Sequence, residues 1–173
     1  RPDAQVGRRR EAQPELALAM APVTPADELD KLLDPSATPA IRTGIAENPN
    51  TSAETLERLY QAKNTRLRAR VAAHPTLTPA VREQILTEND EAILCGLARN
   101  PSLTVDEQLT LARREESTIR QFLCLNPNLT TPAELELARN ADSEIARQLL
   151  RRDDLRPESV EILKNNPDHL VRL

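Results

Sequence analysis

Residues 96–114 read "GLARNPSLTVDEQLTLARR" and residues 122–140 read "FLCLNPNLTTPAELELARN", so an Asn-Pro pair stands twice between two apolar stretches. The pair recurs every 26 residues, with histidine once in place of asparagine, as Asn48-Pro49, His74-Pro75, Asn100-Pro101 and Asn126-Pro127. Self-similarity at a fixed period of this length is the sequence signature of a repeat architecture.

Apolar residues recur with the same period and form ladders along the chain. The first ladder stands seven residues before each Asn or His position and the second three residues before it; they are Ile41, Leu67, Ile93, Ile119, Ile145 and Ile45, Val71, Leu97, Leu123, Leu149. A third ladder is Leu59, Ile85, Leu111, Leu137 and Leu163. We expect these residues to be buried. The repeats are 41–66, 67–92, 93–118, 119–144 and 145–170, and a truncated sixth begins at 171.

Each repeat is predicted to hold two short helices. The first has apolar residues at i, i+4 and i+5, which make one buried stripe, and begins after a capping residue: Asn64, Asp90, Ser117, Asp142 or Asp168. It ends at the Asn-Pro pair because the residue before proline is driven out of the helical region. The second helix, of about ten residues, begins at a capping box, in which Thr104 pairs with Glu107 and Thr131 with Glu134.

The Asn-Pro pairs are therefore interpreted as elbows between the two helices of a repeat. The elbow residues are Asn48, Pro49, Pro75, Asn100, Pro101, Asn126 and Pro127, with His74 in an equivalent structural role and Arg152-Asp153 in the last repeat. Neither helix can bury its stripe alone, so repeats must stack and share a core. The predicted fold is all-α, an α-solenoid with a 26-residue period and no β-sheet.

The residues before the regular repeats are predicted to differ from them. Residues 21–33 match residues 48–60 at an offset of 27, so 15–40 is interpreted as a degenerate capping repeat. Residues 1–14 fit no repeat and are expected to be a polar, mobile lead-in. Because the chain does not begin with Met and stops on "HLVRL", we expect it to be a piece of a longer protein or a trimmed form of one.

The repeats resemble the variant leucine-rich repeat (LRV) family, a HEAT-like α-solenoid, in "LRARVAAHPTLTPAVREQIL", "ILCGLARNPSLTVDEQLTLA" and "IRQFLCLNPNLTTPAELELA". The resemblance covers 41–173 well and 21–40 weakly. It implies a right-handed, all-helical superhelix. In that family one helix of each pair tends to be a 3₁₀ segment, but the longer repeat here favours two α-helices. Some members carry a cysteine-rich iron–sulfur module, which this sequence lacks, so no cofactor is expected.

Composition argues against several classes of function. The net charge of −4 does not favour a polyanion binder by bulk charge, and one Phe, one Tyr and no Trp leave almost no stacking platforms for single-stranded nucleic acid. Cys95 and Cys124 have no metal-ligand spacing and are expected to be buried thiols in a reducing cytoplasm. No metal, no membrane span and no catalytic constellation are expected, so the protein is predicted not to be an enzyme.

Arginine is concentrated in the first-helix segments, where Glu47 is the only acid. The candidate face for an anionic partner is Arg42, Arg68, Arg70, Arg120, Arg147 and Arg172. One interpretation is that arginines and acidic connectors complement helix dipoles and tie neighbouring repeats together. The other is a basic stripe that binds an acidic protein or nucleic-acid phosphates. The spacing leaves both open.

We expect the chain to be a non-enzymatic repeat scaffold that binds another macromolecule through an extended face, with a protein as the expected partner. The alternatives are nucleic-acid binding along the arginines and a structural or accessory segment of a larger polypeptide.

Overall fold

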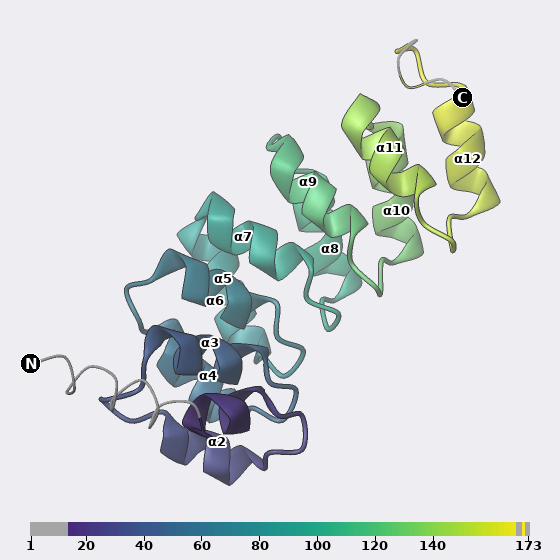
Figure 1. Ribbon diagram of the computed structural model, residues 1–173. Coiled ribbons are helices and arrows are strands. Elements are labelled where there is room, and N and C mark those ends of the chain that lie inside the picture. Colours follow the sequence, from purple (N-terminus) through teal and green to yellow (C-terminus); the bar gives the residue numbers. More distant parts are fainter. Residues whose placement is uncertain (1–13, 169–170, 172–173) are drawn as a thin grey trace, which may run out of the picture. The chain divides into compact units, whose positions relative to one another are not determined.

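The computed structural model describes residues 14–168 and residue 171, and within them every regular element is a helix (Figure 1). The prediction of an all-α fold without a sheet is confirmed for this part of the chain. The chain divides into two compact halves, one ending at Thr87 and the other beginning at Glu88. Each half is described separately.

The N-terminal half begins with a helix over residues 14–20. The elements that follow are α2 (Ala26–Leu32), α3 (Pro39–Glu47), α4 (Ala53–Tyr60), α5 (Thr65–Ala72) and α6 (Pro79–Glu88). Helix α3 packs on α5, and α4 packs on both. Helix α6 ends before Asn89, whose φ of 60° is the left-handed conformation that asparagine tolerates at a helix end.

The C-terminal half contains two layers of helices. One layer is α7 (Glu91–Ala98), α9 (Ser117–Cys124) and α11 (Ser143–Leu150), and the other is α8 (Val105–Ala112), α10 (Thr131–Arg139) and α12 (Pro157–Lys164). Within each layer, every helix contacts the next one along the chain (Figure 1). We call them the first-helix layer and the second-helix layer. The members of both are α-helices, as the repeat length favours.

The apolar ladders form the core. All fifteen predicted ladder residues from Ile41 to Leu163 are buried, with Leu67 the most accessible at 6%. In the C-terminal half, Leu97, Leu123 and Leu149 are completely inaccessible. Because the same positions face inward in successive repeats, their side chains meet those of the neighbouring helix and form the interior of each half.

Most predicted helix starts are correct. The side chains of Asn64, Asp90 and Asp142 accept hydrogen bonds from the first turns of α5, α7 and α11. The capping box of α8 is also confirmed: Thr104 Oγ1 accepts from the Glu107 nitrogen at 3.2 Å, and the Glu107 carboxylate accepts from the Thr104 nitrogen at 3.1 Å.

Two predicted caps are wrong. Glu116, not Ser117, is the N-cap of α9, and the Ser117 hydroxyl donates instead to Asp142 at 2.8 Å. Helix α10 begins at Thr131 itself, so Thr131 is not its cap. Glu134 makes no capping box because its carboxylate is engaged by α12. The residue after the predicted cap Asp168 lies outside the described part of the chain.

The elbow residues do more than stop a helix. Asn126 donates from Nδ2 to the carbonyls of Ala98 and Asn100, both at 2.8 Å, and Asn48 donates to Ala19 and Ala21, both at 2.9 Å. In each case the carbonyls lie at or just after the end of the preceding first helix. The asparagine Oδ1 accepts from the backbone nitrogen two residues further on, which shapes the turn.

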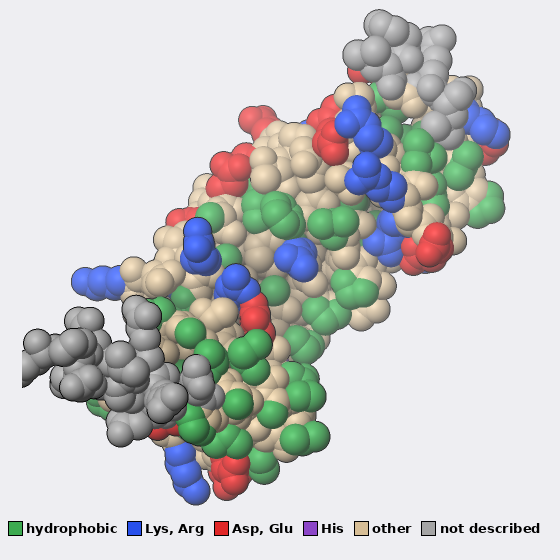
Figure 2. Space-filling view, in the orientation of Figure 1, with side chains coloured by type: hydrophobic (Ala, Val, Ile, Leu, Met, Phe, Trp, Pro, Cys, Tyr) green, Lys and Arg blue, Asp and Glu red, His purple; other side chains and the backbone are tan. Residues whose placement is uncertain are grey.

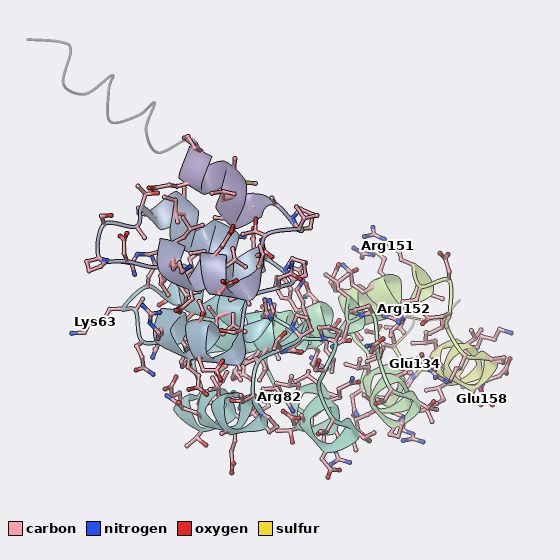
Figure 3. All side chains as sticks on the ribbon, turned by 90° about the horizontal axis from the view of Figure 1, so that it is seen from below. Lys63, Arg82, Glu134, Arg151, Arg152 and Glu158 are labelled. Atoms are coloured by element: carbon pink, nitrogen blue, oxygen red, sulfur yellow. The ribbon has the colours of Figure 1, made fainter. Side chains whose placement is uncertain are left out.

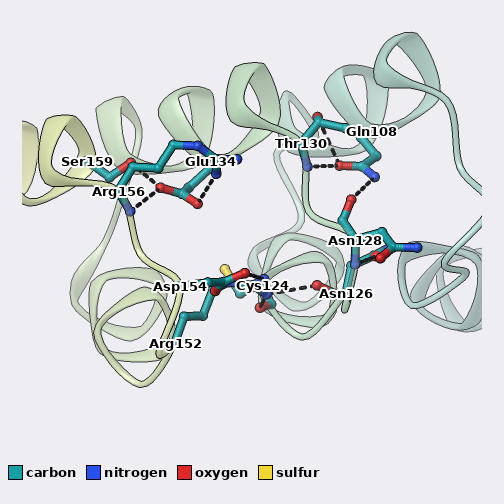
Figure 4. A network of polar contacts seen from close by, with 10 residues as sticks. All are labelled: Gln108, Cys124, Asn126, Asn128, Thr130, Glu134, Arg152, Asp154, Arg156 and Ser159. Atoms are coloured by element: carbon teal, nitrogen blue, oxygen red, sulfur yellow. Dashed lines mark hydrogen bonds and ion pairs between the residues drawn. The ribbon is translucent and has the colours of Figure 1, made fainter.

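Other residue types make the same bond at this position. The Nε2 of His74 lies 2.7 Å from the Asn48 carbonyl, in the structural role expected for this histidine. Arg152 donates from Nη1 to the carbonyls of Cys124 and Asn126, both at 2.8 Å (Figure 4). The elbow of the last repeat is thus held by arginine, whereas Asn48, His74 and Asn126 hold theirs with asparagine or histidine.

Residues 15–40 are joined to the first regular repeat by further hydrogen bonds from an asparagine side chain to backbone carbonyls. Asn50 donates to the carbonyls of Pro22 and Thr24 at 2.7 and 3.0 Å. Helix 14–20 lies so close to α3 that a β-carbon at Gly44 would come within 3.1 Å of the Ala19 side chain. Pro14 belongs to this helix and not to the predicted lead-in. The rest of that lead-in, residues 1–13, lies outside the described part of the chain.

Candidate interaction surface

Two of the candidate arginines occupy the same position in their repeats and turn back onto the backbone. Arg42 donates from Nε to the Ala37 carbonyl at 3.1 Å. Arg68 donates from Nε to the Tyr60 carbonyl at 2.8 Å, and its guanidinium carbon lies 4.3 Å from the centre of the Tyr60 ring. Arg42 therefore holds the connector before its own helix, and Arg68 holds the end of α4.

Arg120, at the same position, links α9 to the connector between α10 and α11. Its Nη1 donates to the Asn140 carbonyl at 2.9 Å, and its Nη2 lies 3.5 Å from the Asp142 carboxylate. The side chain is only 14% exposed, and its Nε is buried without a hydrogen-bond partner among the described residues. This geometry favours the interpretation in which these arginines tie repeats together.

The remaining candidates do not extend a free basic stripe. Arg70 is exposed but forms an ion pair with Glu47, and Arg147 is exposed but lies 2.8 Å from Glu144. Exposed pairs of this kind contribute about 0–1 kcal/mol to stability and partly cancel each other's field. Arg172 lies outside the described residues.

Sequence spacing missed the two arginines that are exposed and unpaired in the first-helix layer. Arg99 is the C-cap of α7 and Arg151 the C-cap of α11, and neither forms an ion pair with any described residue. Figure 3 shows Arg151 projecting away from α11. The signal that could have found them is the comparison of this one position across repeats, which holds Glu47, Ala73, Arg99, Leu125 and Arg151.

Between these arginines, α9 exposes apolar side chains. Leu125, its C-cap, is 53% exposed, and Phe122, one turn earlier, is half-buried. We call Phe122 and Leu125, together with Arg99, Arg147 and Arg151, the α9 patch. Figure 2 shows hydrophobic side chains over α9 beside basic side chains over α11.

The second-helix layer has a buried polar network whose members satisfy one another. Glu134 is completely buried and accepts from the Arg156 backbone nitrogen at 3.0 Å, from Arg156 Nη1 at 2.8 Å and from the Ser159 hydroxyl at 2.6 Å (Figure 4). Gln108, one repeat earlier, accepts from the Thr130 backbone nitrogen at 2.8 Å. Both side chains cap the next second helix, so their chemistry is structural.

A cavity of about 390 Å³ brings Arg113, Arg114 and Arg120 together, but their charges are compensated. Arg114 lies 2.7 Å from Glu116, and Arg113 lies 3.7 Å from Glu136. The Arg114 guanidinium, by its hydrogen bond, lowers the pKa of Glu116 and keeps it ionised. The cavity is therefore not the cationic pocket that a small anion requires.

The two cysteines are buried, as expected. Burial raises the pKa of Cys95 to about 11 and that of Cys124 to about 12, so neither thiol ionises readily near neutral pH. Among the described residues there is no cluster of three or more His, Cys, Asp or Glu that could hold a metal ion. In the same part of the chain, no helix is long and apolar enough to cross a membrane.

Comparisons with family models, with curated proteins and with solved structures found no match. Equivalent positions of the repeats can still be compared with one another, because each repeat shows which residues the fold accepts at a given position.

Proposed function

We propose that the chain is a non-enzymatic repeat scaffold of the cytoplasm that binds another protein, and that its repeats form an LRV-like, right-handed α-solenoid. One observation carries the binding role. Buried ladder positions keep their apolar character from repeat to repeat, whereas outward positions of the first helices change from acidic to small, basic and apolar. Positions freed from packing are the ones that a binding surface can use.

A protein partner fits this surface better than nucleic acid. Three arginines of the predicted basic face hold backbone carbonyls, and two more are paired with glutamates. The exposed first-helix surface of the C-terminal half combines apolar and basic side chains, and interfaces with proteins are enriched in aromatic residues and arginine. Phosphate binding instead requires several free cations along a track.

The test is capture by the immobilised full chain from lysate of the native organism, with and without nuclease, followed by reconstitution with the purified captured species. We expect a protein that is retained after nuclease and binds with defined stoichiometry. Loss of all binding on nuclease treatment would favour the nucleic-acid alternative. Absence of any retained macromolecule would favour a structural or accessory segment and overturn the proposal.

A further inference from the structure

Leu125 stands at a position where the fold does not require an apolar residue. The equivalent position holds Glu47, the last residue of α3, in one repeat and Ala73, the C-cap of α5, in the next, so the end of a first helix accepts either residue. Exposing about half of a leucine to water is unfavourable. Packing within the repeat therefore does not explain the leucine.

Phe122 repeats this pattern one turn earlier on the same helix. Its equivalents are Arg70, Gly96 and Gln148, so no aromatic side chain is needed at this position either. Residues three apart on a helix are neighbours on its surface. Phe122 and Leu125 thus form one apolar spot on α9 that the repeat architecture leaves optional.

The arginines are placed on both sides of this spot. Helix α9 contacts α7 on one side and α11 on the other, and the C-caps of these neighbours are Arg99 and Arg151. Adjacent packed helices are about 8–10 Å apart, so the two guanidinium groups flank Leu125 over roughly 20 Å. An extended segment rises about 3.3 Å per residue and covers this span with about six residues.

Helix dipoles alone do not account for the arrangement. A cation at a helix C-terminus is favourable, but the C-caps of α5 and α9 are Ala73 and Leu125, so the fold does not depend on one. Arg99 and Arg151 also lack an acidic partner among the described residues. Their charge is available to a ligand.

We infer that the α9 patch docks an extended acidic segment of a partner protein, whose central apolar side chain lies against Phe122 and Leu125 and whose flanking carboxylates pair with Arg99 and Arg151. This inference rests on the proposed function and names the chemistry of the partner. The apolar contact supplies a desolvated centre, and the arginines at its edge set the orientation and the rate of association. Binding weakens with added salt because the arginines are exposed.

The test uses the full chain and a short fluorescent peptide with leucine at its centre and glutamates on both sides. We expect saturable binding that is lost when serine replaces the leucine or lysine replaces the glutamates. Leu125→Glu and the double variant Arg99→Glu/Arg151→Glu should each weaken binding at least about tenfold, or roughly 1.4 kcal/mol. No binding of the acidic peptide, or unchanged binding by both variants, would overturn the inference.

The matched controls are Val105→Glu and Arg139→Glu, which change an exposed apolar residue of α8 and an exposed arginine of α10. They should alter binding by less than about twofold, since surface changes away from the contact are nearly neutral. Leu125→Ala introduces the residue found at the equivalent position 73, so it removes the apolar side chain in a way that the fold accepts. It serves as the second variant if Leu125→Glu does not fold. Thermal unfolding should be similar for all variants.

The same variants separate this inference from the proposed function. If a captured protein partner binds both patch variants as tightly as the unmodified chain, the docking site is wrong and the scaffold function stands. If no macromolecule is captured at all, the scaffold function fails, and the peptide measurement still decides the chemistry of the patch.

Discussion

His74 can make its inter-repeat bond to Asn48 together with its bond to Thr76 only as a neutral ring, whereas the asparagine at the equivalent position of other repeats does not titrate. Its Nδ1 accepts from the Thr76 backbone nitrogen at 3.0 Å, and its Nε2 lies 2.7 Å from the Asn48 carbonyl. A ring with one acceptor and one donor nitrogen is neutral. Burial lowers the pKa of His74 below its usual 6.5, and the Asn48 hydrogen bond opposes this only in part.

Stability should therefore fall with decreasing pH through this histidine. Above pH 6.5 both states are neutral, and the full stability is present. As the pH falls below that value, the unfolded chain takes up the proton first, and stability is lost until the lower folded pKa has been passed. His74→Asn should remove this part of the pH dependence. Urea unfolding between about pH 8 and pH 5 measures it.

The control is His169→Asn, which changes the only other histidine of the sequence. This variant should keep the dependence of the free energy of unfolding on pH that His74→Asn loses. An identical slope for His74→Asn and the unmodified chain would show that His74 does not titrate differently in the folded state.

Leu123 and Leu125 are a matched pair for testing the core. Leu123 is completely buried in the second ladder, whereas Leu125 is 53% exposed. Truncation of Leu123 to alanine should lower the free energy of unfolding by about 2–4 kcal/mol, because it removes buried methyl groups and leaves a cavity. Leu125→Ala should cost less than about 0.5 kcal/mol. Equal losses in chemical denaturation would mean that the ladder register is wrong.

At the scale of the element, the buried carboxylate of Glu134 fixes the start of α12. Glu134→Ala leaves the Arg156 nitrogen and the Ser159 hydroxyl without their acceptor, so we expect a loss of about 2 kcal/mol. Glu134→Gln should lose much less, because Gln108 already caps Thr130 in this manner one repeat earlier.

Glu136→Ala is the control for this prediction, since the same helix carries it and its carboxylate makes only a 3.7 Å contact with Arg113 and an exposed hydrogen bond from Asn140 at 3.1 Å. Denaturant unfolding ranks the three variants. If Glu134→Gln is as unstable as Glu134→Ala, the charge of Glu134 and not its capping geometry matters.

Elements could be predicted from the sequence where the signal is local. The Asn-Pro pairs end the first helices, and Thr104 with Glu107 begins α8, because these rules involve residues a few positions apart. The sequence pattern predicts a capping box for Glu134, but the structure forms none, because the partners of Glu134, Arg156 and Ser159, lie one repeat away. Such a carboxylate can bond within its own helix or to the next repeat, and which bond forms depends on the packing of the two repeats.

At the scale of the whole molecule, the period predicted the core better than the surface. Apolar character alone assigned every ladder residue to the interior. The contacts of the arginines are less predictable, because the position of a residue in the repeat does not determine where its long side chain points. Arg120 reaches Asn140, while Arg99 stays exposed. The candidate surface is marked by exposure that differs between equivalent positions of successive repeats.

The elbow hydrogen bonds end on backbone carbonyls, and every amino acid has the same carbonyl. Asn126 would find the same acceptors whatever side chains stood at positions 98 and 100. This hydrogen bond therefore requires a neighbouring repeat but does not depend on the side-chain sequence of that repeat. Gene duplication or deletion of one 26-residue segment thus yields a chain whose new junction needs no compensating substitution at this bond. Such a chain can change in length by recombination, and the exposed residues on its surface are then free to diverge.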